Sequence, residues 1–238
     1  MKKQHFILIV ILLLPSLIYV FLTTGKHHFM SLPFFGPRET TVTTVNGKQV
    51  TDTIYHSIPS FKFVNQDGDT VTEKNYEGRI YVADFFFTSC TSVCPKMTAN
   101  LGVVQDKFKD VDSVLILSHT VNPNTDSVPV LKAYAQTVHA NTKKWTFVTG
   151  SKKAIYDIAY KGYMLNAIED TAQTDIQKQF LHDEHLILVD KEKHIRGIYD
   201  GTSLQDVNKL IDDIKLLRAD YIVKAESKKA KEEKAEKK

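Results

Sequence analysis

The segment FFFTSCTSVCPKM, residues 85–97, contains the only two cysteines of the chain, Cys90 and Cys94. A disulfide between them would close a very small loop, which stabilises a fold by only ~2 kcal/mol or less. Pro95 is typical of the first turn of a helix, where backbone N–H groups lower thiol pKa values and favour thiolates. These features favour a redox-active thiol pair or a metal site over two inert core thiols.

A metal site needs ligands besides the two thiolates. Soft thiolates select Cu(I) or zinc, and two thiolates with one imidazole would make a three-coordinate copper site, whereas zinc would want a fourth ligand. Of the nine histidines, His182 and His185 occur in FLHDEHLILVD, directly before a predicted strand. A loop that enters a late strand of a thioredoxin-like sheet lies beside the helix that would carry the cysteines. The residues alone leave a redox pair and a metal site open.

The rest of the chain supplies the elements that must position these residues. Asn46-Gly47 and Asp67-Gly68 lie between alternating polar and apolar runs, which indicates two β-hairpins. Continuous apolar runs predict buried strands, and apolar residues at helical spacing predict the helices between them. The order indicates an α/β protein with a thioredoxin-like fold and an extra N-terminal β-hairpin. The predicted strands are 79–87, 113–121 and 145–150, the helices 95–108, 127–140, 151–164 and 203–223, and the late hairpin 185–202.

Residues 6–24 carry no charge and are long enough, at ~1.5 Å per residue, to span a bilayer as a helix. Lys2 and Lys3 precede them, which favours a cytoplasmic N-terminus and a domain outside the cytoplasm or in the periplasm. We therefore expect a single-pass anchor in the cell (inner) membrane over residues 1–25, a linker over 26–39, the thioredoxin-like domain over 40–222 and a charged tail over 223–238.

The formal net charge of the chain is +3, and the seven lysines and four glutamates from Lys224 onward account for all of it. The remainder is nearly neutral and lacks the basic stripe with interleaved aromatic residues that marks nucleic-acid-binding proteins. The sequence therefore predicts no nucleic-acid partner. The tail is interpreted as a solvated helix end or a disordered extension.

Several motifs together resemble the Sco (SenC) family of copper-binding, thioredoxin-like proteins of cytochrome c oxidase assembly, over about residues 33–215. FFFTSCTSVCPKM is similar to its F-x-F-T-x-C-x-x-x-C-P copper motif, WTFVTG to its W-x-x-L-T-G strand, and FLHDEHLILVD to the segment of its distal histidine. The resemblance implies copper ligation by Cys90, Cys94 and His182, with His185 as the rival histidine. It also implies that a copper-bearing cytochrome c oxidase subunit is the partner.

The segment SHTVNPNTDSVPVLKAYAQ is similar to the D-P-x-x-D-T segment of that family, but Asn122 replaces its first aspartate. The resemblance implies mainly a metallochaperone. The alternative function is a thiol–disulfide oxidoreductase that uses Cys90 and Cys94 as its redox-active pair. The two roles compete, because a disulfide removes both thiolate ligands. A peroxidase is disfavoured, because Phe87 stands where the peroxidase pattern has a proline.

Overall fold

The structure is a computed structural model that describes residues 3, 13–16, 31–45, 48–165 and 184–236. It divides into two units, Met1–Ser31 and Leu32–Lys238. Within the described residues, no helix is both long and apolar enough to cross a membrane. The expected anchor, residues 6–24, lies outside the described residues except for Leu13–Ser16.

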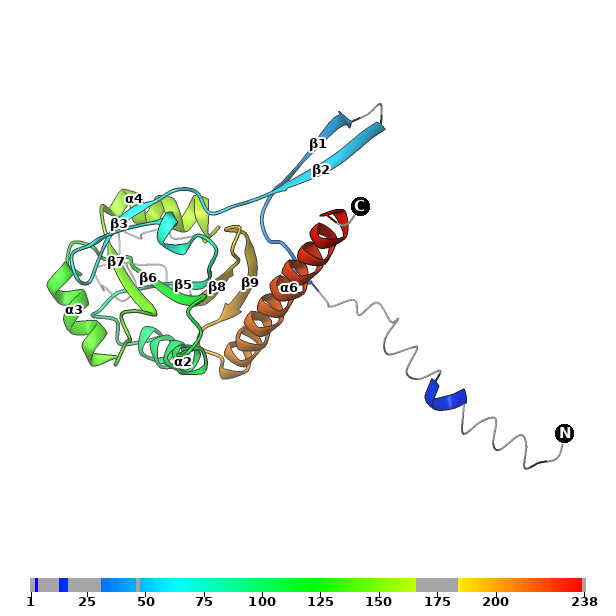
Figure 1. Ribbon diagram of the computed structural model, residues 1–238. Helices are drawn as coiled ribbons and strands as arrows, with labels where there is room; N and C mark the ends of the chain where they lie inside the picture. The colour runs from blue at the N-terminus through cyan, green and yellow to red at the C-terminus, as the bar shows by residue number, and fades with distance from the viewer. Residues whose placement is uncertain (1–2, 4–12, 17–30, 46–47, 166–183, 237–238) are drawn as a thin grey trace. The chain divides into compact units, whose positions relative to one another are not determined.

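A seven-stranded mixed sheet forms the centre of the second unit (Figure 1). Its strand order is β4-β3-β7-β6-β5-β8-β9, with β5, β6 and β7 parallel and the other neighbouring pairs antiparallel. Every residue of β5 and β6 is buried, as their continuous apolar sequences predict for strands covered on both faces. The strands are β3 (Lys62–Asn65), β4 (Thr70–Thr72), β5 (Ile80–Phe86), β6 (Val114–Thr120), β7 (Trp145–Thr149), β8 (His185–Val189) and β9 (Ile195–Asp200).

Helices cover both faces of this sheet. Successive strand residues point to opposite faces, and neighbouring residues of β5 show this directly. Phe86 stacks on Tyr134 of α3, whereas Phe85 makes an edge contact with Tyr163, which follows η2. Figure 1 shows α4 on the opposite side of the sheet from α2. The helices are η1 (Glu73–Tyr76), α2 (Cys94–Lys107), α3 (Val128–Thr137), α4 (Lys152–Asp157), the π-helix η2 (Ile158–Gly162) and α6 (Leu204–Glu236).

Both early hairpins form where the sequence predicts them. β1 (Arg38–Val45) and β2 (Lys48–Tyr55) pair antiparallel, with Val45 opposite Lys48, as a separate two-stranded sheet. In the turn between β3 and β4, Gly68 has a φ of +89°, a left-handed conformation that glycine adopts without strain. The predicted extra N-terminal hairpin is therefore present.

Two helices differ in extent from the sequence prediction. The helix expected over 151–164 begins as predicted, because the Ser151 hydroxyl accepts the Ala154 N–H at 3.2 Å. The α-helix ends at Asp157, and the chain continues as the π-helix η2. The last helix extends beyond 223, because α6 runs through the Lys/Glu tail to Glu236 with residues 226–233 exposed. The described part of the tail is therefore a solvated helix end, one of the two alternatives expected for it.

Candidate functional site: a buried thiol pair at one end of the sheet

Cys90 and Cys94 lie at the carboxyl end of β5, where the chain passes from the central strand into α2. Cys90 is in the loop, and Cys94 is the first residue of α2, with Pro95 directly after it. Both are free cysteines, with 8% and 4% of their surfaces exposed. The sequence prediction of a thiol pair at a strand-to-helix junction is therefore confirmed.

The two thiols have different proton affinities because they share one hydrogen bond. The Cys94 thiol donates to the Cys90 sulfur, and the Ser92 hydroxyl and the backbone N–H groups of Ser92 and Cys94 add to the stabilisation, which together lower the pKa of Cys90 to about 5. The same bond and burial raise the pKa of Cys94 well above its ordinary value. At neutral pH the site therefore holds one thiolate and one thiol, so Cys90 is both a nucleophile and a soft metal ligand.

A buried carboxylate fixes the start of the cysteine loop. Asp126 accepts the Thr88 backbone N–H at 3.1 Å and the Thr88 hydroxyl at 2.5 Å, and it also accepts the hydroxyl of Thr120 at the end of β6. Asp126 is fully buried. It therefore ties the loop that follows β5 to the end of β6. Sequence reasoning noted Asp126 within a motif but did not assign it this positioning role.

A second buried carboxyl belongs to Asp84 of β5, the strand that leads into the loop of Cys90. Its Oδ1 accepts the Ser118 hydroxyl, and the Trp145 indole N–H donates to Ser118 at 2.8 Å. Burial raises the pKa of Asp84 to about 7, and its charge acts on Cys94. Sequence reasoning missed this group. A lone aspartate within the apolar run RIYVADFFF was the signal that could have found it.

His119 of β6 is a buried histidine on the same face of the sheet as Phe85. Its ring stacks on Phe85 with centroids 4.8 Å apart and makes edge contacts with Phe63 and Tyr163. Neither ring nitrogen has a hydrogen-bond partner in the part of the chain that the structure describes, and burial lowers the pKa to about 3. His119 is therefore a neutral core ring rather than a ligand aimed at the thiols.

The structure places one of the two candidate histidine ligands, His185, and not the other, His182. His182 lies outside the described residues. His185 is the exposed first residue of β8. Because β8 runs antiparallel to β5, with Val189 opposite Tyr81 and Ile187 opposite Ala83, His185 lies at the cysteine end of the sheet. The described chain also resumes at Glu184 at this end.

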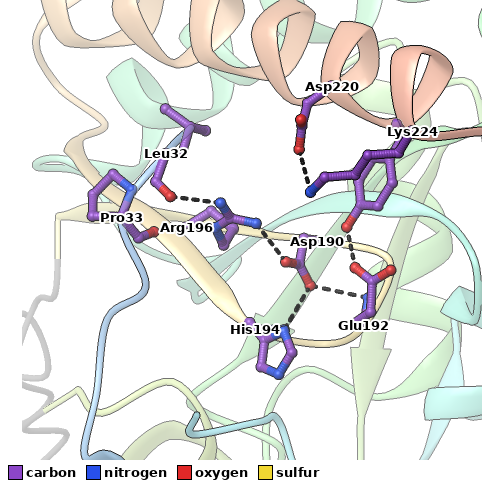
Figure 2. A network of polar contacts seen from close by, with 9 residues as sticks. Leu32, Pro33, Asp190, Glu192, His194, Arg196, Asp220 and Lys224 are labelled. Carbon is purple, nitrogen blue, oxygen red and sulfur yellow. Dashed lines mark hydrogen bonds and ion pairs between the residues drawn. The ribbon is translucent and has the colours of Figure 1, made fainter. Parts of the chain in front are cut away.

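A cluster of Asp190, Glu192 and His194 lies at the other end of the sheet, in the β8–β9 turn (Figure 2). Asp190 Oδ1 accepts the backbone N–H groups of Glu192 and His194, at 3.0 and 2.8 Å, and Oδ2 pairs with Arg196 at 2.9 Å. These bonds and the adjacent guanidinium occupy the carboxylate that a cation would need. The cluster is the one group of three such side chains found among the described residues, and it is structural.

Arg196 also holds the start of the second unit. It donates to the carbonyl of Leu32 at 2.5 Å and to the carbonyl of Pro33 at 3.1 Å (Figure 2). Its guanidinium also lies 4.0 Å from the centre of the Phe34 ring. The Phe35 N–H adds a bond to the Ile195 carbonyl at 2.9 Å. The second unit therefore begins against the end of the sheet opposite the cysteines.

Comparisons with known proteins agree with this fold. The family model described as SCO1/SenC matches residues 35–218. The SCO1 protein homolog of Bacillus subtilis is 31% identical over 172 residues, which cover 71% of this chain and 86% of that protein.

Two solved structures are also similar to the chain. The protein BsSco, described as a member of the Sco family of cytochrome c oxidase assembly proteins with a disulfide switch, is 28% identical, with a TM-score of 0.56 over 66% of this chain and 92% of that one. Arabidopsis thaliana ScoI, solved with copper bound, is 26% identical, with a TM-score of 0.56 over 68% of this chain and 98% of that one.

Proposed function

This chain belongs to the SCO1/SenC family, and we propose that it is a membrane-anchored copper chaperone that delivers copper to a cytochrome c oxidase subunit. The observation that carries the proposal is the pair of free, buried thiols at the start of α2, one of which has its pKa lowered to about 5. A thiolate present at neutral pH binds a soft metal without first losing a proton. The copper bound to the Arabidopsis relative and the assembly role of BsSco support this proposal.

The proposed ligands are Cys90, Cys94 and His182, with copper as the cargo. Two thiolates and one imidazole suit Cu(I), whereas a structural zinc site has four protein ligands. His182 precedes Glu184 by two residues, and two residues of extended chain span at most about 7 Å. Because Glu184 lies at the cysteine end of the sheet, this short reach supports His182 as the third ligand.

We further propose that residues 1–25 anchor the chain once in the cell membrane and that the domain lies outside the cytoplasm or in the periplasm. The uncharged segment 6–24 and the preceding Lys2 and Lys3 support this arrangement. An anchored chaperone would meet an oxidase subunit within the same membrane. Its thiols would also be in a compartment where disulfides form.

The different proton affinities of the two thiols favour a second candidate function, a thiol–disulfide oxidoreductase. The Cys90 thiolate would attack a disulfide of the partner and release one partner thiolate. Cys94, after giving up its proton, would attack the mixed disulfide. The products are a Cys90–Cys94 disulfide and a fully reduced partner, so two electrons pass to the partner. The same oxidation would remove both copper ligands.

Copper titration of the full chain in detergent tests the proposal. The reduced chain should bind one equivalent of Cu(I) in competition with a chromogenic chelator, and the Cys90–Cys94 disulfide form should bind none. Cys90→Ser and Cys94→Ser should each abolish stoichiometric binding. If the reduced chain binds no copper but reduces a disulfide substrate, the oxidoreductase candidate replaces the chaperone.

The histidine assignment needs a matched pair of variants. His182→Ala should weaken copper binding strongly, because it removes a proposed ligand, whereas His185→Ala, three residues away, should leave all three proposed ligands in place and have a much smaller effect. The reverse result would assign the ligand role to His185. Affinity for copper should also fall at low pH, because a protonated imidazole cannot bind the metal.

A further inference from the structure

An open groove of about 550 Å³ begins at Cys90 and runs between α2 and α3. One wall consists of α2 residues at helical spacing, from Pro95 through Ala99 to Val103, and the opposite wall includes Tyr134 and Val138 of α3. The hydroxyls of Thr98 and Tyr134 are 3.0 Å apart and join the two helices at one point of the groove. Of the two thiols, Cys90 lines this groove and Cys94 does not.

Gly102 keeps the middle of the groove bare. It lies inside α2, where glycine is a poor helix former because it loses more backbone entropy than other residues. A Cβ at this position would meet no atom within 4 Å, so neither close packing nor a positive φ requires glycine here. Next to it, Val103 leaves 42% of its surface exposed. The groove thus presents an uncovered apolar floor at a position where a larger side chain would fit the fold.

The two ends of the groove differ in chemistry. Cys90 occupies one end, and Asp106 is the charged side chain among the groove residues. Asp106 makes no ion pair within the described part of the chain. The rise from Pro95 to Asp106 along α2 is about 16 Å at 1.5 Å per residue. An extended segment of about five residues has this length.

We propose that this groove docks an extended segment of the partner protein that carries a cysteine at the Cys90 end, an apolar side chain over Gly102 and a lysine or arginine beside Asp106. The inference rests on the proposed function, because it names the contact through which copper or a disulfide is exchanged. A thiol of the partner placed at Cys90 could accept copper directly from the thiolate, or form a mixed disulfide with it. The order of side chains in the segment follows from the groove: cysteine at Cys90, the apolar side chain over the uncovered surface at Gly102, and the cation at the carboxylate of Asp106.

Synthetic peptides test this recognition without a named partner. The probe is the disulfide dimer of Cys-Ala-Leu-Ala-Lys, together with the reversed order and versions in which leucine is replaced by serine or lysine by glutamate. The full chain in detergent carries Cys94→Ser, so that the mixed disulfide persists. The Cys90 thiolate attacks the peptide disulfide, a Cys90–peptide disulfide forms, and one peptide thiolate leaves. Competition with glutathione disulfide gives the relative equilibrium constants.

In one of the two orders, the leucine peptide should form the mixed disulfide roughly fivefold more favourably than the serine peptide, because a leucine side chain is partly buried. The lysine peptide should exceed the glutamate peptide by about threefold, the size of an exposed ion pair. Gly102→Leu should abolish the leucine preference, and Asp106→Asn the lysine preference. Equal constants for all peptides, or preferences that survive these substitutions, would overturn the proposal.

Val103→Glu and Val130→Glu form a matched pair of controls. Both valines are exposed, at 42% and 37%, but Val103 lines the groove and Val130 does not. Val103→Glu should remove the leucine preference, and Val130→Glu should leave it unchanged. Copper stoichiometry of the chain with both cysteines is measured separately for Gly102→Leu and should remain at one equivalent. If the unaltered chain binds no copper, the proposed function is refuted, but the peptide preferences can still be measured and still test the groove.

Discussion

The polar groups at the two ends of the central sheet have different partners. At the Asp190 end, both carboxylate oxygens have partners, and Arg196 joins Asp190 to Leu32 and Pro33 (Figure 2). At the cysteine end, the hydrogen bond from Cys94 lowers the pKa of Cys90 and burial raises the pKa of Asp84. Neither ring nitrogen of His119 has a hydrogen-bond partner among the described residues. The Nδ1 of His194 at the Asp190 end is also without a hydrogen-bond partner among the described residues, so the difference lies in the paired carboxylate and the thiolate. A fully paired buried carboxylate holds a fold together, whereas a thiolate with a lowered pKa is typical of a reactive site.

This contrast explains why the cluster that looks most like a metal site is the structural one. Asp190, Glu192 and His194 are close enough to surround an ion, but the guanidinium of Arg196 already balances the buried charge. The thiol pair has no cation to balance its thiolate among the described residues that shift its pKa.

Replacement of Arg196 by methionine should destabilise the fold by ~3–5 kcal/mol, because it leaves the carboxylate of Asp190 buried without its partner. Urea denaturation followed by tryptophan fluorescence measures this change. The matched control is Lys153→Met, which removes an exposed pair with Asp157 and should cost at most ~0.5 kcal/mol. Copper stoichiometry of the folded Arg196 variant should be unchanged. A loss below 1 kcal/mol would refute the structural role of this end.

Asp84→Asn should stabilise the fold above neutral pH by on the order of 2–4 kcal/mol. Burial raises the pKa of Asp84 from 3.8 to about 7. Between these values the folded state holds a proton that the unfolded state has released, so stability falls as pH rises from about 4 to about 7. The variant should lose this slope in denaturation measured across that range. An unchanged slope would mean that Asp84 is ionised in the fold at lower pH.

His119→Phe should stabilise the fold by ~1–3 kcal/mol, because it keeps an aromatic ring and removes two buried nitrogens that have no partner among residues 31–45, 48–165 and 184–236. The pKa of His119 is lowered from 6.5 to about 3. The unfolded state therefore takes up a proton first, and stability is lost as pH falls from about 6.5 toward 3. The variant should retain more stability in this range.

His56→Phe provides the matched control, since His56 Nε2 bonds the Gly162 carbonyl at 2.7 Å. That substitution removes the partner of a carbonyl and should destabilise the fold. If both histidine variants change stability in the same direction, hydrogen-bond satisfaction does not distinguish the two sites.

Local patterns in the sequence predicted most of the fold. Apolar runs marked β5 and β6, Asn-Gly and Asp-Gly marked the hairpins, and Pro95 marked the start of α2, because each signal depends on neighbouring residues alone. The contacts of Arg196 with residues 32 and 33 are separated by more than 160 positions, so no local pattern contains them. The pairing of Asp84 with Ser118 likewise depends on strand register. The thiol pair could be predicted, but its division into thiolate and thiol required the geometry. The role of His182 stays a prediction.

Truncation after Ala225 should have the smallest effect on stability and tests whether the tail contributes to the Asp190 end of the sheet. The buried side of α6 ends near Leu217, and residues 226–233 are exposed. The truncated chain retains the Tyr221–Glu192 bond and the Lys224–Asp220 pair. It loses the Lys228–Glu232 pair at 3.9 Å, which is solvent-exposed. Because exposed pairs contribute little, the free energy of unfolding should change by less than ~0.5 kcal/mol. A loss above 1 kcal/mol would show that the tail belongs to the network that closes this end of the sheet, and that stability there does not depend on Asp190 and Arg196 alone.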